Sequence, residues 1–456
     1  MPTQTAATGA KPLENMTYWQ RTFGCQMNEN DAERVAGMLE EAGALPVLTI
    51  EEADIAVFLT CCVREKADIR LMGQLASIKN IPPAHEEKRI IAVGGCIGQR
   101  DGELLHEQLD HVDVVFGTHN LASLVRLIKT RIDTGLPAIE TVDENEGFAS
   151  SLPVRRDKPW HAWVPIMTGC DNFCTYCIVP YVRGRESSRT LEDIHRELSG
   201  LAEQGIKELT LLGQNVNSYG RDLYGKPRFA EVLAMAADCG VERVRFVTSH
   251  PKDLLAETIE AMATHPAIMP QLHLPLQSGS DRILDAMNRK YDIAHYLGLV
   301  QQLRDKVEGI SLSTDIIIGF PGETEEDFQQ TLDVCEQVGY GQMFRFIYSK
   351  RSGTPAATMQ QNATREELQD RFERLEAVAQ ASSLAENRRE IGRTLDVLIE
   401  SASKRDGRVL AGKSPKNQTV HAPMPEGKSI DAFEGRIVKV RIEDATTNYL
   451  QGSLVQ

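Results

Sequence analysis

The chain has 456 residues, 41% of them hydrophobic and 25% charged, and a formal net charge of −15. This length and composition are ordinary for a globular protein of about two or three domains. No apolar run approaches the roughly 20 residues of a membrane helix, and residues 1–15 lack the apolar core of a signal peptide. We therefore expect a cytosolic protein without a membrane partner.

The first part of the chain predicts a small parallel α/β domain. Short apolar runs typical of buried strands alternate there with amphipathic helical patterns. The expected strands are 18–23, 54–60, 90–93 and 112–116, and the expected helices are 28–41, 64–79 and 121–132. We assign residues 16–132 to this domain and the polar stretch 133–159 to a linker.

A second alternation of strands and helices predicts a partial (β/α)6 barrel over residues 160–390. The expected strands are 163–167, 208–212, 243–248, 271–274, 311–318 and 342–348. Thr364 and Glu367 have the spacing of a capping box, which places the start of a long helix there. Short runs separated by glycine turns over residues 391–456 predict a small all-β barrel. The fold class is therefore α/β with a C-terminal β-barrel.

Three cysteines form the most specific motif in the chain. Cys170, Cys174 and Cys177 lie in a Cys-x3-Cys-x2-Cys pattern on the loop after the first strand of the second domain. In a reducing cytosol, clustered cysteines are more often metal ligands or nucleophiles than disulfides. Three thiolates can hold a four-iron cluster and leave one iron open. The alternatives are a zinc site with a remote fourth ligand and a structural ferredoxin-like cluster, and spacing alone does not exclude them.

This motif, placed directly after the first barrel strand, resembles the radical S-adenosylmethionine (SAM) superfamily. The resemblance implies that Cys170, Cys174 and Cys177 bind a 4Fe–4S cluster whose open iron is chelated by SAM. It also implies that SAM is cleaved to a carbon radical, which is chemistry suited to a C–H bond too inert for acid–base attack. We assign no acid–base catalytic residue.

Three further cysteines follow predicted strands of the first domain. Cys25, Cys61 and Cys96 come after the first three strands, and the carboxyl ends of parallel strands meet at one edge of a sheet. Gly24 and Gly95 would let the backbone approach a bulky group at this edge. The alternative is three unrelated buried thiols, because free cysteine packs as a small hydrophobe.

The segments around these cysteines, 22–28, 60–67 and 93–96, resemble the N-terminal domain of the methylthiotransferases. The resemblance implies that Cys25, Cys61 and Cys96 bind a second 4Fe–4S cluster, which handles the sulfur to be inserted. Leu59 stands where the family usually has Asn, which puts a hydrogen bond near the ligands in doubt. Cys62 could take the place of Cys61 as a ligand. Cys239 and Cys335 lie in helical patterns and are assigned to packing.

Segments 173–189, 212–219, 273–280 and 315–324 resemble the branch of this family that modifies isopentenyl-adenosine in tRNA. The implied reaction adds a methylthio group to C2 of N6-isopentenyl-adenosine next to the anticodon, using two SAM molecules, an electron donor and a sulfur donor. At strand ends, Gln214, Asn215 and Gln277 are expected to line the barrel mouth that binds SAM, although each could equally be a capping or turn residue. We expect a monomer.

The tRNA partner must be reconciled with the negative net charge. Residues 391–420 carry six basic and three acidic side chains, and the C-terminal barrel resembles the RNA-binding TRAM domain. A locally basic surface can bind phosphates despite an acidic body, although such a segment can also be a solvated loop face. The candidate RNA-binding residues are Arg393, Lys404, Arg405, Arg408, Lys413 and Lys416. We also expect Arg183, Arg185 and Arg189 to contact phosphates of an anticodon loop whose adenosine is splayed out.

Two other functions compete with this hypothesis. One is a sister methylthiotransferase that acts on threonylcarbamoyl-adenosine in tRNA or on a ribosomal protein. The other is an iron–sulfur RNA-binding protein without catalysis. Nothing in the spacing of residues distinguishes one modified adenosine from another.

Overall fold

The computed structural model describes residues 11–62, 65–85, 88–143 and 151–455 and divides into two compact parts. The first part comprises the chain up to residue 157 together with residues 168–170 and 178–185. The second part comprises the remainder. Within the described residues, no helix combines the length and the apolar character needed to cross a bilayer.

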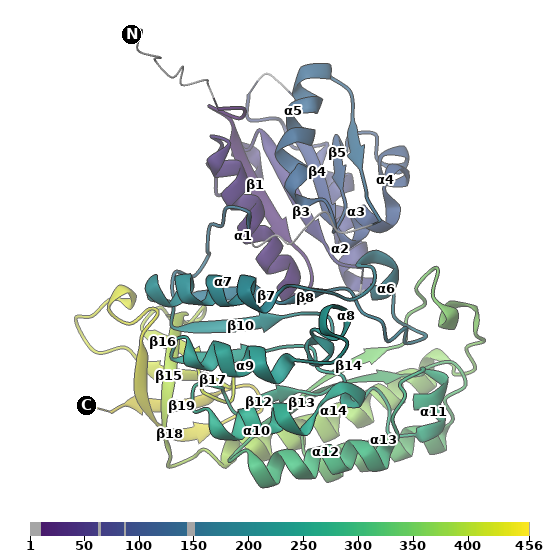
Figure 1. Cartoon of the computed structure of the whole chain (residues 1–456), viewed down its shortest axis with the longest axis vertical. Coiled ribbons are helices and arrows are strands. Elements are labelled where there is room, and N and C mark those ends of the chain that lie inside the picture. Colours follow the sequence, from purple (N-terminus) through teal and green to yellow (C-terminus); the bar gives the residue numbers. More distant parts are fainter. Residues whose placement is uncertain (1–10, 63–64, 86–87, 144–150, 456) are drawn as a thin grey trace. The chain divides into compact units, whose positions relative to one another are not determined.

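The first part is built on a six-stranded parallel sheet with the order β2-β1-β3-β4-β5-β6 (Figure 1). Its strands are β1 (Thr17–Thr22), β2 (Leu45–Pro46), β3 (Ile55–Thr60), β4 (Ile90–Gly95), β5 (Val114–Phe116) and β6 (Ala138–Glu140). Every residue of β3 and β4 is buried, as expected for central parallel strands covered on both faces. The parallel sheet predicted from the sequence is confirmed.

Helices cover both faces of this sheet, because successive side chains of a strand point to opposite sides. Ile55, Val57 and Leu59 of β3 pack in one apolar cluster with residues of α1 and α5. Ala56 and Phe58 pack in another cluster with residues of α2, α3 and α4. The helices are α1 (Gln26–Glu41), α2 (Glu65–Ile78), α3 (Cys96–Asp101), α4 (Glu103–Gln108) and α5 (Leu124–Thr134), with short 3₁₀ turns at Ile50–Glu52 and Leu121–Ser123.

The second part contains the six parallel strands expected of the partial barrel. They form two three-stranded sheets, β11-β10-β7 and β12-β13-β14, whose residues share one apolar core. The strands are β7 (His161–Pro165), β10 (Glu208–Leu212), β11 (Arg243–Phe246), β12 (Gln271–His273), β13 (Ser311–Ile318) and β14 (Gln342–Ile347). Two short strands, β8 (Met167–Thr168) and β9 (Ser187–Ser188), flank the cysteine triplet.

The helices that follow these strands in the chain range from four residues in α6 and α8 to 24 residues in α14. Thr364 and Glu367 form the capping box expected at the start of α14, with reciprocal hydrogen bonds between side chains and backbone. The helices are α6 (Val179–Val182), α7 (Leu191–Glu203), α8 (Arg221–Tyr224), α9 (Phe229–Asp238), α10 (Ala256–Thr264), α11 (Asp281–Ala286), α12 (Ile293–Lys306), α13 (Glu325–Val338) and α14 (Arg365–Arg388). Four 3₁₀ turns lie at Val216–Ser218, Pro251–Asp253, Pro355–Thr358 and Ile430–Ala432.

The C-terminal segment forms a closed five-stranded barrel with the order β15-β16-β17-β19-β18, which confirms the all-β prediction. Its strands are β15 (Thr394–Ala402), β16 (Val409–Lys413), β17 (Thr419–Pro423), β18 (Ile437–Ala445) and β19 (Leu450–Leu454). Two buried arginines at the start of β11 hold this barrel. Arg243 donates to the carbonyls of Asp396 and Lys413, and Arg245 donates to those of Ser414 and Pro415.

Candidate active site

The N-terminal cysteines lie at one edge of the parallel sheet. Cys61 directly follows β3, Cys96 directly follows β4 and begins α3, and Cys25 precedes the first residue of α1. The register pairs Thr60 with Gly95, so the two strands end side by side immediately before their cysteines. The structure therefore brings together the three thiols that the strand pattern predicts at this edge.

The thiols at this edge lie close enough to shift one another's pKa values. A hydrogen bond with the Cys61 thiol lowers the pKa of Cys25 to about 5, against the opposing effect of burial. A hydrogen bond with the Cys62 thiol lowers the pKa of Cys96 to about 7. The same hydrogen bond, together with burial, raises the pKa of Cys62. Low thiol pKa values favour thiolates, which are the ligands that iron–sulfur clusters require.

Two glycines allow the backbone to pack this closely. Gly24 has a φ of +118°, and a Cβ at this position would overlap the Cβ of Cys61. Gly95 has a φ of +86°, and a Cβ there would lie 2.7 Å from the carbonyl oxygen of Thr60. Any other residue at either position would strain the turn that presents the thiols.

Polar contacts behind the cysteines come from Asn28 and Thr60. Asn28 Nδ2 donates to the carbonyls of Phe23 (2.6 Å) and Thr60 (2.9 Å). Thr60 Oγ1 donates to the carbonyl of Gly94 (2.6 Å) and accepts from the N–H of Ile97 (3.0 Å). Leu59, at the position where the resemblance leads us to expect Asn, is buried in the apolar core. Asn28 on α1 supplies a side-chain amide at this edge.

The second cysteine set lies on the loop between β8 and α6. Backbone bonds fix the middle of this loop: Thr175 donates to the carbonyl of Met287 (3.0 Å), and its own carbonyl accepts from Ala356 (2.9 Å). Cys174 is buried, and its Sγ accepts a hydrogen bond from a guanidinium nitrogen of Arg289 at 3.6 Å. Cys170 and Cys177 are partly exposed. The loop thus holds its central thiol against a cation.

The donor set can hold an iron–sulfur cluster without converging on one point. Among the described residues, no three Cys, His, Asp or Glu side chains are close enough to ligate one ion. A 4Fe–4S cluster binds each cysteine through a different iron, so its ligands do not need to converge on one point. Three thiols within eight consecutive positions, 170–177, match that requirement.

The carboxyl ends of β10 and β11 carry buried polar atoms that lack hydrogen-bond partners. Asn215 donates to Asp253 at 2.8 Å, but its Oδ1 has no partner within the described chain. The same holds for both side-chain polar atoms of Asn217, for Ser249 Oγ and for His250 Nε2. Buried polar atoms are normally satisfied, so this edge fits a polar ligand such as SAM.

The structure places the other two predicted mouth residues as follows. Gln214, next to Asn215, is partly buried after β10. Gln277 is buried with a φ of +70°, and its backbone bridges to β13 by donating to Asp315 (2.8 Å) and accepting from Ile317 (2.9 Å). A role for its side chain in binding SAM stays a prediction.

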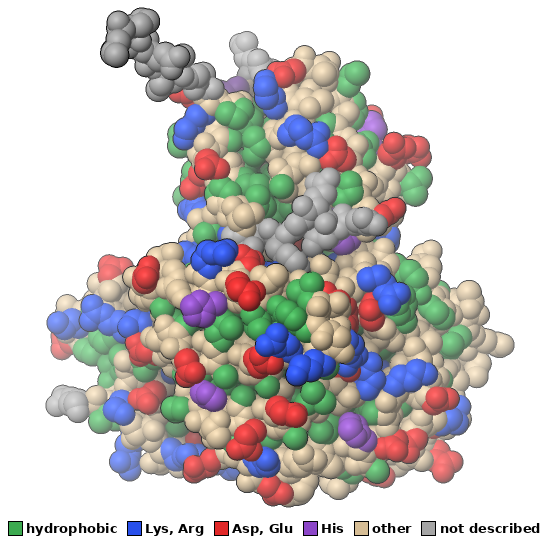
Figure 2. Space-filling view, in the orientation of Figure 1, with side chains coloured by type: hydrophobic (Ala, Val, Ile, Leu, Met, Phe, Trp, Pro, Cys, Tyr) green, Lys and Arg blue, Asp and Glu red, His purple; other side chains and the backbone are tan. Residues whose placement is uncertain are grey.

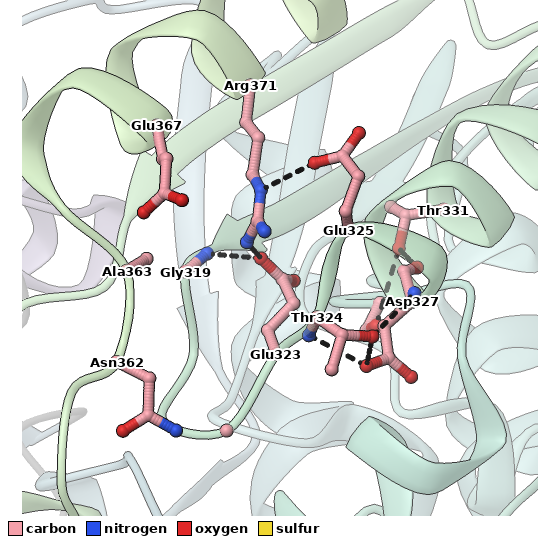
Figure 3. Close-up of polar contacts among 12 residues, drawn as sticks. Gly319, Glu323, Thr324, Glu325, Asp327, Thr331, Asn362, Ala363, Glu367 and Arg371 are labelled. Atoms are coloured by element: carbon pink, nitrogen blue, oxygen red, sulfur yellow. Dashed lines mark hydrogen bonds and ion pairs between the residues drawn. The ribbon is translucent and has the colours of Figure 1, made fainter.

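The loop after β13 is fixed by a buried ion pair (Figure 3). Glu323 Oε2 accepts from the N–H of Gly319 at 2.7 Å and pairs with Arg371 of α14 at 2.9 Å. Both side chains are buried, and Arg371 also reaches the exposed Glu325 at 3.2 Å. This pair connects the carboxyl end of a barrel strand to the long α14 helix.

We expect Glu323→Ala to lower the free energy of unfolding by about 3 kcal/mol, because it leaves a buried guanidinium with only an exposed partner. Glu325→Ala is the matched control. Glu325 contacts the same arginine, but its side chain is 58% exposed against 2% for Glu323, so its loss should cost about 0–1 kcal/mol. Urea unfolding followed by circular dichroism measures both. Equal losses of unfolding free energy in the two variants would contradict the argument that the buried pair stabilises the fold more than the exposed one.

The candidate RNA-binding residues differ in how far their side chains are exposed. Lys404 and Arg405 are exposed, and Arg408 is 90% exposed. Arg393 is exposed beside Glu390, whereas Lys416 is 14% exposed and pairs with Glu386 and Glu390. Lys413 is half-buried, which lowers its pKa, and donates to Thr419.

Acidic and basic side chains are interspersed on the face drawn in Figure 2, so the negative net charge forms no continuous acidic surface there.

Two of the three arginines expected to contact phosphates are buried, and that prediction is wrong for them. Arg189 pairs with Asp193 (2.8 Å) and Glu197 (2.5 Å) of α7. Arg183 lies among the N-terminal cysteines. Arg185 is exposed, and its phosphate contact stays a prediction.

Three family descriptions match this chain in succession. Uncharacterized protein family UPF0004 matches residues 17–117, the Radical SAM superfamily matches residues 164–335, and the TRAM domain matches residues 388–455. These matches cover β1 to β5 with the N-terminal cysteines, part of β7, β10 to β13 and the closed barrel, whereas β6 and β14 lie outside the matched ranges.

Curated relatives match nearly the whole chain. A protein of Leifsonia xyli subsp. xyli is 45% identical over 438 residues, covering 95% of this chain and 81% of the relative. A protein of Desulforamulus reducens is 44% identical over 441 residues, covering 96% and 95%. Both are named tRNA-2-methylthio-N(6)-dimethylallyladenosine synthase.

Among solved structures, the fold is similar to that of the radical S-adenosylmethionine methyltransferase TsrM of Kitasatospora setae with cobalamin and a 4Fe–4S cluster bound. The TM-score is 0.54 at 14% sequence identity, over 75% of this chain and 74% of the other. At this identity the likeness concerns the fold alone.

Proposed function

Because this chain belongs to the radical SAM methylthiotransferases whose curated members are named tRNA-2-methylthio-N(6)-dimethylallyladenosine synthase, we propose how its two cysteine sets divide the reaction. The family is enzymatic, uses a 4Fe–4S cluster with SAM, and acts on tRNA. The proposed product is 2-methylthio-N6-isopentenyl-adenosine next to the anticodon. The proposal covers the six ligands, the second cluster and the position on the base.

Cys170, Cys174 and Cys177 would hold the cluster that binds SAM. Bound there, the cluster and SAM supply a carbon radical able to abstract hydrogen from an inert C–H bond. The chain's own side chains would orient and enclose the cluster and SAM. Arg289 donates to Cys174, and the unpartnered polar atoms of Asn215 and Asn217 line the edge where SAM would bind. Buried donors and acceptors fixed in this way reduce the reorganisation needed on binding.

Cys25, Cys61 and Cys96 would hold a second cluster that carries the sulfur to be inserted. The observation that supports this proposal most is the meeting of three thiols from three strand ends at one sheet edge, with glycines where the backbone must approach closely. A sulfur donor must replace the inserted sulfur, and an external reductant must supply electrons.

The experiment that tests the two-cluster proposal is an iron and labile-sulfide count on the anaerobically reconstituted full chain. Two 4Fe–4S clusters require about eight irons and eight sulfides per chain. About four irons and four sulfides per chain would account for the SAM-binding cluster and contradict the proposed second cluster. Mössbauer spectra of the same sample would establish that the iron is in 4Fe–4S clusters.

The exposed basic residues of the C-terminal barrel give a separate prediction about tRNA. We expect the triple variant Lys404→Gln, Arg405→Gln and Arg408→Gln to weaken tRNA binding and to reduce the salt slope by about one per lost phosphate contact. The control is Lys439→Gln on β18, where the exposed lysine pairs with Asp396. Filter binding across a salt series measures both. An unchanged salt slope in the triple variant would mean that these three residues do not contact the RNA phosphates.

A further inference from the structure

One buried arginine beside the N-terminal cysteines is supplied by the segment that follows the other cysteine set. Arg183 is the sixth residue after Cys177, and residues 178–185 belong to the compact N-terminal part. Ile178 and Val182 are buried in the apolar cluster that contains Phe58 and Cys96. Thr118 Oγ1 donates to the carbonyl of Val182 at 2.6 Å, which fixes the end of α6.

The arginine side chain is enclosed and held by polar partners. It is 6% exposed, one guanidinium nitrogen donates to Asn28 Oδ1 at 3.1 Å, and the same nitrogen lies 3.5 Å from Asp31 Oδ2. Asn28 is itself oriented by its bonds to the carbonyls of Phe23 and Thr60. The guanidinium also lies near the Cys96 and Cys25 side chains and interacts electrostatically with both.

A buried guanidinium is costly unless opposite charges and acceptors surround it. Its side-chain partners in the described structure are one carboxylate, one amide and thiols of the cysteine set. A cluster bound by three thiolates would add negative charge on the side of the guanidinium that faces Cys96 and Cys25. The environment of Arg183 therefore matches a negatively charged group held by these cysteines.

We propose that Arg183, held by Asn28 and Asp31, is a positioning residue for the N-terminal cluster and offsets the negative charge of the cluster from beside Cys96 and Cys25. This inference rests on the second cluster of the proposed function. Hydrogen bonds to cluster sulfurs and nearby positive charge raise the reduction potential, because they stabilise the more negative reduced state. Arg183 therefore sets the potential of the cluster that carries the sulfur and helps to retain its iron.

Arg89 offers a matched control for a purely structural role. It is a buried arginine of the same sheet domain, and its guanidinium donates to the carbonyls of Ala53, Glu51, Ile81 and Pro82. These carbonyls lie before the amino ends of β3 and β4, whereas Arg183 lies beside the cysteines at the carboxyl ends of the strands. A variant of Arg89 should destabilise the domain without affecting the cluster.

The test uses the full chain carrying Cys174→Ala, so that the remaining cluster signal comes from the N-terminal site. Arg183→Met, Arg183→Lys and Arg89→Met are compared in this background by redox titration with electron paramagnetic resonance and by the rate of iron loss to a chelator. We expect Arg183→Met to shift the midpoint potential to more negative values and to lose iron about tenfold faster. Arg183→Lys should shift the midpoint potential less than Arg183→Met does, because lysine keeps the positive charge but lacks the planar guanidinium.

The outcomes separate this inference from the function that it depends on. A cluster in the Cys174→Ala chain whose potential and iron retention are the same in Arg183→Met would overturn the inference alone. An equal shift in Arg89→Met would also overturn it, because general destabilisation would then explain the effect. Absence of any cluster in the Cys174→Ala chain would overturn both the inference and the two-cluster proposal.

Discussion

Cys174→Ala is expected to reduce the cleavage of SAM by more than about 100-fold, because a lost ligand should cost more than the 10- to 100-fold typical of a lost outer-shell contact. Cys174 is the buried, central thiol of its loop and accepts a hydrogen bond from Arg289. Binding of tRNA should be retained, since the six main candidate residues for RNA contact lie in the C-terminal segment. Formation of 5′-deoxyadenosine and a gel-shift assay measure the two properties.

Cys239→Ala is the matched control for this prediction. Cys239 caps the C-terminus of α9 and belongs to the packing of the barrel core. Its replacement should leave SAM cleavage unchanged. Undiminished cleavage in Cys174→Ala would remove the radical assignment, whereas loss of tRNA binding in that variant would point to a folding defect.

Cys61→Ala is expected to separate the two halves of the reaction. Cleavage of SAM should continue, because Cys170, Cys174 and Cys177 are unchanged in this variant. The methylthio product should fall below detection. The iron content should fall from about eight to about four per chain. Product and iron are measured on the same anaerobic sample by nucleoside mass spectrometry and iron assay.

Cys62→Ala, one position away, is the control for Cys61→Ala. Cys62 is fully buried in an apolar cluster and forms a hydrogen bond with Cys96. If Cys61 is the ligand, Cys62→Ala should keep both clusters and the product. Methylthio product from Cys61→Ala, together with its loss in Cys62→Ala, would assign the ligand role to Cys62.

The sequence predicts much of this architecture because local patterns carry it. The first three central strands of the N-terminal sheet are marked by apolar runs, and a cysteine follows each of them within three residues. Parallel topology then brings these cysteines to one edge. The six strands of the second part and the start of α14 are visible for the same reason: period, length and capping residues are local signals.

The elements that the sequence does not predict depend on tertiary pairing. β6, of three residues, lies within the stretch assigned to a linker and becomes a strand by pairing with β5. β2, of two residues, also becomes a strand by pairing with β1 and is not among the expected strands. Short runs of this kind carry little strand signal of their own.

The two misassigned arginines differ in what the sequence could have indicated. Arg189 pairs with Asp193 and Glu197, and these acids at helical spacing just downstream are a local signal for an intramolecular ion pair. Arg183 contacts Asn28, 155 positions away, through the docking of α6 on the N-terminal part. No pattern around Arg183 indicates that contact, so it requires the structure.

The most direct test of the central claim is mass spectrometry of nucleosides after an anaerobic reaction. The reconstituted chain receives SAM, a reductant and tRNA carrying isopentenyl-adenosine, and a parallel sample receives tRNA carrying threonylcarbamoyl-adenosine. We predict 2-methylthio-N6-isopentenyl-adenosine from the first tRNA and no methylthio product from the second. Product from the second tRNA alone, or cleavage of SAM without either product, would contradict the proposed function.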